Sequence, residues 1–337
     1  MKNSLVADKR PVRSRGFTLI ELLVGLTLGV LVLFALITLF ANNSRMRREI
    51  DQASQQIENG RYALDLLRDD LHLAGYYGNA VPWRGYATAA ATVPDVCATT
   101  AAGIQFASSP SRWPVPVSGI AAGDATPACV TGPGRKAGTD ILVVRRTSTI
   151  PTPASELESG SLYVQASGCN AEGQQHKDFV FDSGANAATF ALRKNGCAVT
   201  ADIYEFETHV YYVSDEAIPT LRLLTISGTT VANEPLVEGI DDLRVEYGRD
   251  GSGDGTPEEF RKCLSTADPC SAVDWADTVA VRVHLLARSL DGLGGHVDTK
   301  TYTLGTGAVV GPFNDPYKRH AYSSVVRLMN PAGRREL

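Results

Sequence analysis

The sequence predicts an α+β fold in which one long N-terminal helix packs on an antiparallel β-sheet domain. A nearly unbroken apolar segment covers residues 17–41, and a proline-free stretch with helical periodicity continues from it to residue 75. Beyond Thr139 the pattern changes to short runs in which apolar and polar residues alternate. Such alternation suits a sheet with one buried face, and that face is the natural place for the helix to pack.

A basic leader, residues 1–16, precedes the apolar segment. Its charged residues are Lys2, Asp8, Lys9, Arg10, Arg13 and Arg15. Cations ahead of a span predict an N-terminus in the cytoplasm and an exported C-terminal domain. Arg45, Arg47 and Arg48 follow the span and weaken this prediction, but the leader carries the denser cluster.

The segment 17–41 is long enough to cross a membrane, since about 20 apolar helical residues span the hydrocarbon core. Its one charged residue is Glu21. A lone carboxylate in lipid costs roughly 2.5–3.5 kcal/mol, so we expect it to have a partner. Gly25 and Gly29 form a Gly-x-x-x-Gly pair, which can let two helices approach closely but also arises by chance.

Residues 42–75 are predicted to continue the same helix with an amphipathic pattern. Apolar or small residues recur at heptad spacing in two rows, Ile50, Ile57, Leu64 and Leu71, and Ala53, Gly60, Leu67 and Ala74. The other face is rich in charge and most simply solvated. Gly75 and Gly78 predict the end of the helix.

The remaining chain divides into a loop-rich region at 76–138, a β-rich domain at 139–330 and a C-terminal tail at 331–337. The loop-rich region has one candidate short strand near residues 104–106. In the β-rich domain the predicted strands are 140–146, 161–166, 178–182, 189–194, 208–213, 221–226, 242–247, 278–287, 298–304 and 321–328.

Six cysteines lie in the part of the chain predicted to be exported: Cys97, Cys129, Cys169, Cys197, Cys263 and Cys270. An even number outside the cytoplasm favours disulfides, and six cysteines allow 15 connectivities. Pairing of sequence neighbours closes the shortest loops, and we favour it. A zinc site is disfavoured because no Cys-x-x-Cys pair occurs and the histidines are scattered.

Charge and motif content argue against nucleic-acid binding and catalysis. The formal charge is −5 and becomes more negative once the basic leader is removed, so we predict no direct contact with nucleic acid. The sequence contains no Gly-x-Ser-x-Gly elbow, His-Glu-x-x-His motif or phosphate-binding glycine loop. We therefore expect no enzymatic activity and no required cofactor.

One acidic, glycine-rich stretch, residues 250–259, is a candidate calcium loop. Asp250, Ser252 and Asp254 precede Gly255 with the spacing of an EF-hand loop, and oxygen ligands of this kind suit a hard cation. The twelfth place is Arg261 instead of glutamate, so Glu258 or Glu259 would have to complete the site. An ordinary acidic hairpin loop is the alternative.

The stretch Gly16-Phe17-Thr18-Leu19-Ile20-Glu21-Leu22 resembles the processing motif of type IV prepilins, type II secretion pseudopilins and related filament subunits. The resemblance implies that a prepilin peptidase cleaves between Gly16 and Phe17 and methylates the new amine of Phe17. Glu21 would then pair with the amine of a neighbouring subunit. The alternative is a generic signal-anchor helix with an incidental glutamate.

Further stretches are similar to PilW-type minor pilins. They are ENGRYAL at 58–64, LHLAGYYG at 71–78, PLVEGI at 235–240, VEYG at 245–248 and YSSVVRLMN at 322–330. Asn79 stands where such proteins often carry a cysteine, which leaves the expected disulfide pattern open. Thr38 stands about where major pilins commonly carry a proline, a departure that favours an initiating subunit.

The resemblance implies a minor pilin, with a type IV pilin-like fold, that primes pilus assembly and sits at the pilus tip in adhesion, twitching motility or DNA uptake. The implied partners are the membrane, other minor pilins, the major pilin, prepilin peptidase, the inner-membrane assembly platform and a large tip adhesin. The protein would cross the inner membrane once, with its C-terminal domain periplasmic, before entering the fibre. Alternatives are a J-like type II secretion pseudopilin and a membrane-anchored periplasmic binding protein or enzyme.

Overall fold

The computed structural model describes residues 16–78, 93–104, 107–108, 111–173, 179–263 and 268–336. The chain forms two compact units, Met1–Asp51 and Gln52–Leu337, and each is described by itself. The predicted leader, apart from Gly16, lies outside the described residues.

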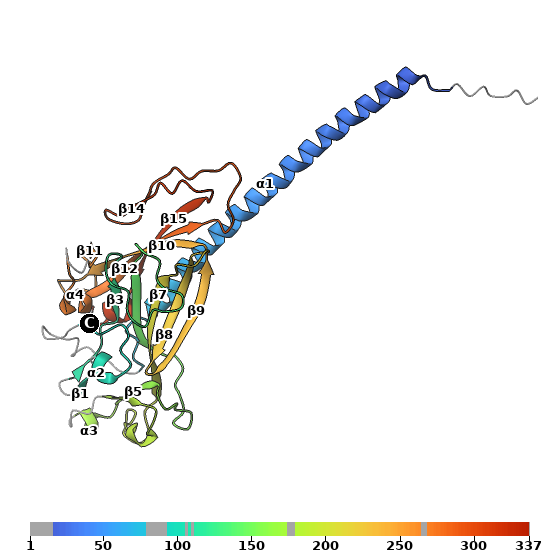
Figure 1. Cartoon of the computed structure of the whole chain (residues 1–337). Helices are drawn as coiled ribbons and strands as arrows, with labels where there is room; N and C mark the ends of the chain where they lie inside the picture. The colour runs from blue at the N-terminus through green and yellow to red at the C-terminus, as the bar shows by residue number, and fades with distance from the viewer. Residues whose placement is uncertain are drawn as a thin grey trace, which may run out of the picture. The chain divides into compact units, whose positions relative to one another are not determined.

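The described part of the first unit consists of the beginning of helix α1 (Leu19–Leu73), which continues into the second unit (Figure 1). Every large apolar side chain from Phe17 to Phe40 is more than half exposed. Length and composition alone would allow this helix to cross a membrane. The predicted start at Phe17 is wrong by two residues, because Thr18 occupies the cap position.

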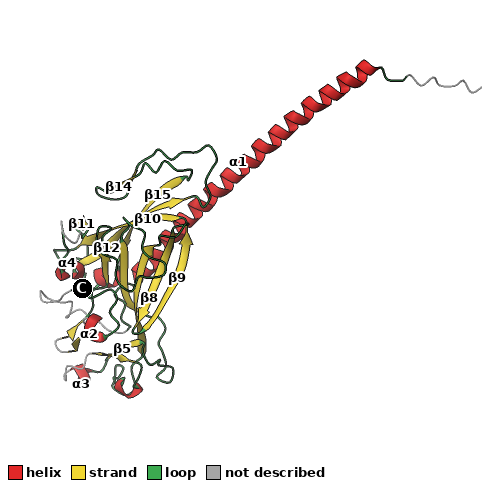
Figure 2. Cartoon of the chain, viewed as in Figure 1, coloured by secondary structure: helices red, strands yellow, loops and turns green. Residues whose placement is uncertain are grey.

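The second unit is built mainly of antiparallel strands (Figure 2). Its larger sheet has seven strands in the order β3-β4-β7-β5-β6, with β8 paired to β7 and β9 paired to β8. These strands are β3 Val117–Ile120, β4 Ile141–Thr147, β5 Leu162–Ala166, β6 Phe179–Ser183, β7 Ile203–Val213, β8 Thr220–Ser227 and β9 Thr230–Glu238.

A four-stranded sheet has the order β11-β10-β12-β15, and two small sheets pair β1 with β2 and β13 with β14. Their bounds are β1 Ala107–Ser108, β2 Ser111–Arg112, β10 Ile240–Arg249, β11 Glu259–Arg261, β12 Thr278–Arg288, β13 Tyr302–Thr303, β14 Val309–Val310 and β15 Arg319–Arg327. Short helices are α2 Ala101–Ile104, α3 Asn170–Gly173, the 3-10 turn η1 Ala187–Thr189, α4 Ala272–Ala276 and α5 Met329–Gly333.

The C-terminal part of α1 packs into the main hydrophobic core together with both larger sheets. Leu67 and Leu71 are fully buried in one cluster with Val144 of β4 and Val283 of β12. Burial of each such side chain contributes about 1.5–3 kcal/mol. Gly60 is required for this close packing, because a Cβ atom there would lie 2.3 Å from the Tyr322 ring.

The predicted heptad stripe is correct only toward the C-terminal end of α1. Leu71 and Ala74 are buried, whereas Ile50 and Ile57 are 59% and 44% exposed. The helix ends at Leu73, and Gly75 has a φ of +71°, the left-handed conformation that terminates many helices. This ending agrees with the predicted stop.

Most predicted strands are present, with ends shifted by a few residues. The strand predicted at 189–194 is wrong, because the 3-10 turn η1 occupies its start. Asn186 caps this turn, and its side chain accepts from the Ala188 N–H. The strand predicted at 298–304 is reduced to the two residues of β13. At the start of that segment, the Asp298 carboxylate accepts a hydrogen bond from Arg319. Strands β9 and β11 were not predicted.

The predicted loop-rich region contains α2 and β3 in addition to loops. Residue 104, expected near a short strand, is the last residue of α2, and residues 105–106 lie outside the described residues. All six cysteines form disulfides between sequence neighbours, Cys97–Cys129, Cys169–Cys197 and Cys263–Cys270, as favoured from the sequence. A disulfide typically stabilises a fold by about 2–4 kcal/mol.

The predicted tail starts inside α5 and is attached to the end of α1. The Asn330 side-chain amide donates to the Ala74 carbonyl at 3.1 Å, and the Arg334 guanidinium donates to the Gly75 carbonyl at 2.7 Å. Carbonyl groups at a helix end lack partners within the helix. The C-terminal segment therefore supplies hydrogen bonds where α1 ends.

Candidate functional site

The start of α1 is closed by a pair of reciprocal hydrogen bonds. The Glu21 carboxylate accepts from the Thr18 backbone N–H at 3.0 Å, and the Thr18 hydroxyl accepts from the Glu21 N–H at 3.3 Å. This is the capping-box arrangement, which satisfies two backbone donors at a helix N-terminus. The helix begins at Leu19, two residues after Phe17, the first residue past the predicted cleavage position.

Glu21 thus has a local partner in its own chain. The Thr18 hydroxyl also lies 2.9 Å from the same carboxylate oxygen, Oε2. These bonds reduce the cost of placing the carboxylate in an apolar environment, because its charge is partly satisfied before any neighbour arrives. Pairing of Glu21 with the amine of another subunit stays a prediction.

A shallow groove of about 460 Å³ runs along the same side of α1 as Glu21. Gly25 and Gly29 line it, and beyond the helix's own neighbouring backbone no described atom lies within 4 Å of the Cβ position at either glycine. Packing within the first unit therefore does not require glycine at these two positions. A helix-packing role for them stays a prediction.

A buried polar cluster around Asp70, the Asp70 cluster, joins the C-terminal part of α1 to the larger sheet. The Asp70 carboxylate accepts from Arg146 Nε at 2.6 Å and from the Tyr211 hydroxyl at 2.9 Å, and it lies 2.9 Å from His209 Nδ1. Glu207 completes the cluster, 3.1 Å from His209 Nε2 and 3.2 Å from an Arg146 nitrogen.

The charges of the Asp70 cluster stabilise one another. Burial alone would raise the pKa of Asp70, but the hydrogen bond and charge of His209 and the charge of Arg146 outweigh it and lower that pKa to about 2. Burial alone would lower the pKa of His209, but hydrogen bonds to Asp70 and Glu207 raise it. The cluster therefore holds an ionised carboxylate inside the core and fixes α1 against β4 and β7.

Sequence reasoning missed the Asp70 cluster. Its one local signal is that Asp70 falls seven residues after Ala63 and three after Leu67, on the buried face of the helix. A charged residue on such a face needs a partner elsewhere in the fold. The partners here are 76 and 139 residues away in the sequence.

Two family models match the chain. The prokaryotic N-terminal methylation motif covers residues 12–37, which include the predicted cleavage position and Glu21. The model of type IV pilus-assembly protein W covers residues 210–330. By these two matches the chain is similar to the PilW family of minor pilins. The similarity lies in the motif at the N-terminal end and in the β-rich segment 210–330.

Among solved structures, the chain is similar to a type IV-like pilin from Thermus thermophilus. The identity is 12%, the alignment covers 85% of this chain and 98% of that chain, and the TM-score is 0.33. So low a TM-score adds nothing to the assignment. No curated protein matches the sequence.

The stretches that resemble PilW-type proteins lie at structurally defined places. Residues 235–240 contain the turn between β9 and β10, where Gly239 has a φ of +76°. Residues 245–248 lie in β10, and residues 322–330 run from β15 into α5. The family match therefore includes the four-stranded sheet that packs on α1.

The predicted calcium ligands are close together in the loop after β10. Ligand oxygens of Asp250, Asp254 and Glu258 lie within 4.8 Å of one another, and the Ser252 hydroxyl is 3.3 Å from an Asp250 oxygen. The structure thus brings the four predicted residues into one loop. No helix pair flanks this loop, which lies between β10 and β11.

The same carboxylates are already engaged in hydrogen bonds. Asp250 accepts from the backbone N–H groups of Gly253 at 2.6 Å and Gly255 at 2.8 Å, and Arg335 lies 3.3 Å from it. Burial opposes ionisation of Asp250, but the hydrogen bonds from Gly255 and Gly253 lower its pKa. Glu258 accepts from the Gly251 N–H at 2.8 Å. These bonds close the loop without a cation, and calcium binding stays a prediction.

Proposed function

We propose that this protein is a PilW-type minor pilin that primes assembly of a type IV pilus and takes a place at the pilus tip. The observation that supports it most directly is the start of α1. There, an exposed apolar helix begins immediately after the cleavage sequence and presents Glu21 within its first turn.

The first step of the proposed mechanism is cleavage after Gly16. It would give Phe17 a cationic amine, one residue before the Thr18–Glu21 capping box. In a membrane or a filament core, the amine of one subunit and the Glu21 carboxylate of the next would attract strongly, since both charges leave water. Exchange of the local Thr18 bonds for this ion pair would select subunits that have been processed.

The apolar half of α1 would hold the precursor in the inner membrane, with the β-rich unit in the periplasm. Extraction by the assembly platform would then transfer this apolar surface from lipid to the other pilins. The proposed partners are other minor pilins, the major pilin, prepilin peptidase and a large tip adhesin. The role is structural, and the site residues serve assembly instead of catalysis.

Gene deletion with complementation tests this proposal. We expect the deletion strain to lose surface pili, counted by electron microscopy, and the wild-type gene to restore them. Secretion of type II substrates should be unaffected. Normal pili together with a secretion defect would refute the pilus role and support a J-like pseudopilin instead. A strain normal in both would refute both assembly roles.

A further inference from the structure

A cavity of about 310 Å³ lies in the second unit, between α1 and the C-terminal part of the chain. Ala53, Gln56, Ile57 and Arg61 line it from α1. The opposite wall comes from residues 296–302 and from the start of β15. This volume is at the lower end of the range for small-molecule sites.

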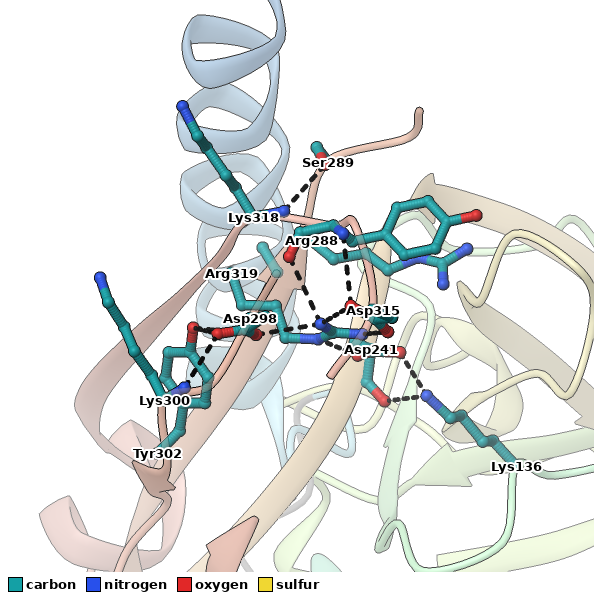
Figure 3. A network of polar contacts seen from close by, with 12 residues as sticks. Lys136, Asp241, Arg288, Ser289, Asp298, Lys300, Tyr302, Asp315, Lys318 and Arg319 are labelled. Carbon is teal, nitrogen blue, oxygen red and sulfur yellow. Dashed lines mark hydrogen bonds and ion pairs between the residues drawn. The ribbon is translucent and has the colours of Figure 1, made fainter. Parts of the chain in front are cut away.

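The inner wall of the cavity is a charge-compensated network (Figure 3). Arg319 contacts three carboxylates, those of Asp241 at 2.7 Å, Asp298 at 3.0 Å and Asp315 at 2.6 Å. Lys136 makes a further ion pair with Asp241. Arg288 supplies a third cation, since Arg319 and Arg288 together lower the pKa of Asp315. Three cations therefore face the three carboxylates, and of these acids only Asp298 lines the cavity.

The rim of the cavity is positively charged. Arg61, Lys300 and Lys318 all line it. In Figure 3 the two lysine side chains extend in the same direction, away from the aspartates that surround Arg319. Within the ranges that the structure describes, the side chains of Arg61 and Lys300 form no ion pair. Cations converging on a concave surface attract an anion and raise its local concentration.

The cavity walls also offer apolar and aromatic surface. Ile57, Tyr302 and Tyr322 contribute side chains, and Tyr302 is held in place because its hydroxyl donates to Asp298 at 3.0 Å. His296 lines the cavity with a buried Nε2 atom that has no hydrogen-bond partner among the described residues. Buried polar atoms without partners are uncommon in native proteins.

We propose that this cavity binds a small organic anion. Its carboxylate or phosphate would lie at Arg61 and Lys300 on the rim, with Lys318 nearby, and its carbon skeleton would pack on Tyr302 and Tyr322. Such a ligand matches the positive rim, the neutral inner wall and the aromatic surface together. The binding site is independent of the assembly role proposed above.

Calorimetric titration of the full chain in non-ionic detergent tests the proposal with three probes: D-glucuronate, glucose 6-phosphate and glucose. At low salt we expect one or both anionic sugars to bind and glucose to bind at least tenfold more weakly. Binding of glucuronate alone identifies a carboxylate ligand, and binding of glucose 6-phosphate alone identifies a phosphate ligand. Binding should weaken as salt is raised.

Arg61→Gln and Lys300→Gln are the informative variants, because both side chains are exposed and outside the core. Each should weaken binding about fivefold, the factor expected for losing one unit charge about 4 Å from the anion in water. Lys194→Gln, a cation outside the cavity, should bind like the wild type. Circular dichroism spectra would show whether the variants are folded.

Three results would overturn the proposal. They are no heat from either anion at about 10 mM, equal binding of glucose, and wild-type affinity in folded Arg61→Gln and Lys300→Gln proteins.

Discussion

Replacement of Asp70 by alanine should destabilise the second unit strongly. The Asp70 side chain is 8% exposed and accepts hydrogen bonds from Arg146 and Tyr211 while contacting His209. Loss of the Asp70 carboxylate leaves the largely buried guanidinium of Arg146 without its nearest carboxylate. Removing one partner of a buried ion pair typically costs about 3–5 kcal/mol. We expect a loss of about 3 kcal/mol in the free energy of unfolding, since Glu207 remains to compensate part of the charge.

The size of this loss should depend on pH in a defined way. The pKa of Asp70 is lowered from 3.8 to about 2, so its contribution is present above pH 3.8 and lost as pH falls toward 2. The difference between these pKa values corresponds to roughly 2 kcal/mol. The pKa of His209 is raised above 6.5, so its contribution is present below pH 6.5 and is lost as pH rises through the raised value. The gap between wild type and variant should therefore be widest between about pH 4 and 6.5.

Urea unfolding of the full chain in non-ionic detergent, followed by tryptophan fluorescence, measures this gap. Asp69→Ala is the matched control, because Asp69 is the neighbouring residue on the same helix and is exposed. We expect it to change the free energy by no more than about 0.5 kcal/mol. Equal stability of the two variants, or a gap that does not vary with pH, would refute this reasoning.

Four further predictions concern the ends of α1 and the acidic loop. Gly16→Glu should leave the precursor uncut, whereas N-terminal sequencing of the wild-type protein should begin at Phe17; a wild-type protein that starts at its first residue contradicts the motif assignment. Glu21→Ala should be processed normally but give no pili by electron microscopy, and normal piliation would remove Glu21 from the mechanism. Calcium at millimolar concentration should give binding heat with the wild type and none with Asp254→Ala; no heat with the wild type rejects the site. Asn330→Ala should lower the free energy of unfolding by about 1 kcal/mol in urea titrations, and an unchanged midpoint would show that this cap is dispensable.

Local sequence patterns predicted the features that depend on local periodicity. The long helix followed from an apolar run joined to heptad spacing, and strand β12 followed from alternation at Val279, Val281 and Val283, all of which are buried. Strand β9 was missed because its sequence lacks such alternation. It lies at the edge of the larger sheet, and most of its residues are exposed, so it has no alternating pattern.

Features that depend on distant residues could not be predicted. The sequence places Asp70 within a helix, but only the fold brings His209 and Arg146 to it. The same is true of the cavity, where Arg61 and Lys300 are far apart in the chain and lie on one rim. The calcium-loop residues were recognised because they are sequence neighbours. The hydrogen bonds that these carboxylates accept from backbone N–H groups were not predicted, because they depend on the conformation of the loop.

The polar attachments along α1 have a mechanical consequence. Gln56 donates to the Ala287 carbonyl at 2.8 Å, Asn59 donates to the Glu238 carbonyl at 3.1 Å, and Asp70 and Ala74 accept from the sheet and from α5. A slip of the helix by one residue moves every group about 1.5 Å along the axis, more than a hydrogen bond tolerates. An axial pull on this part of α1 would therefore load these bonds together, in shear. Such a joint resists tension far better than the same bonds broken one at a time.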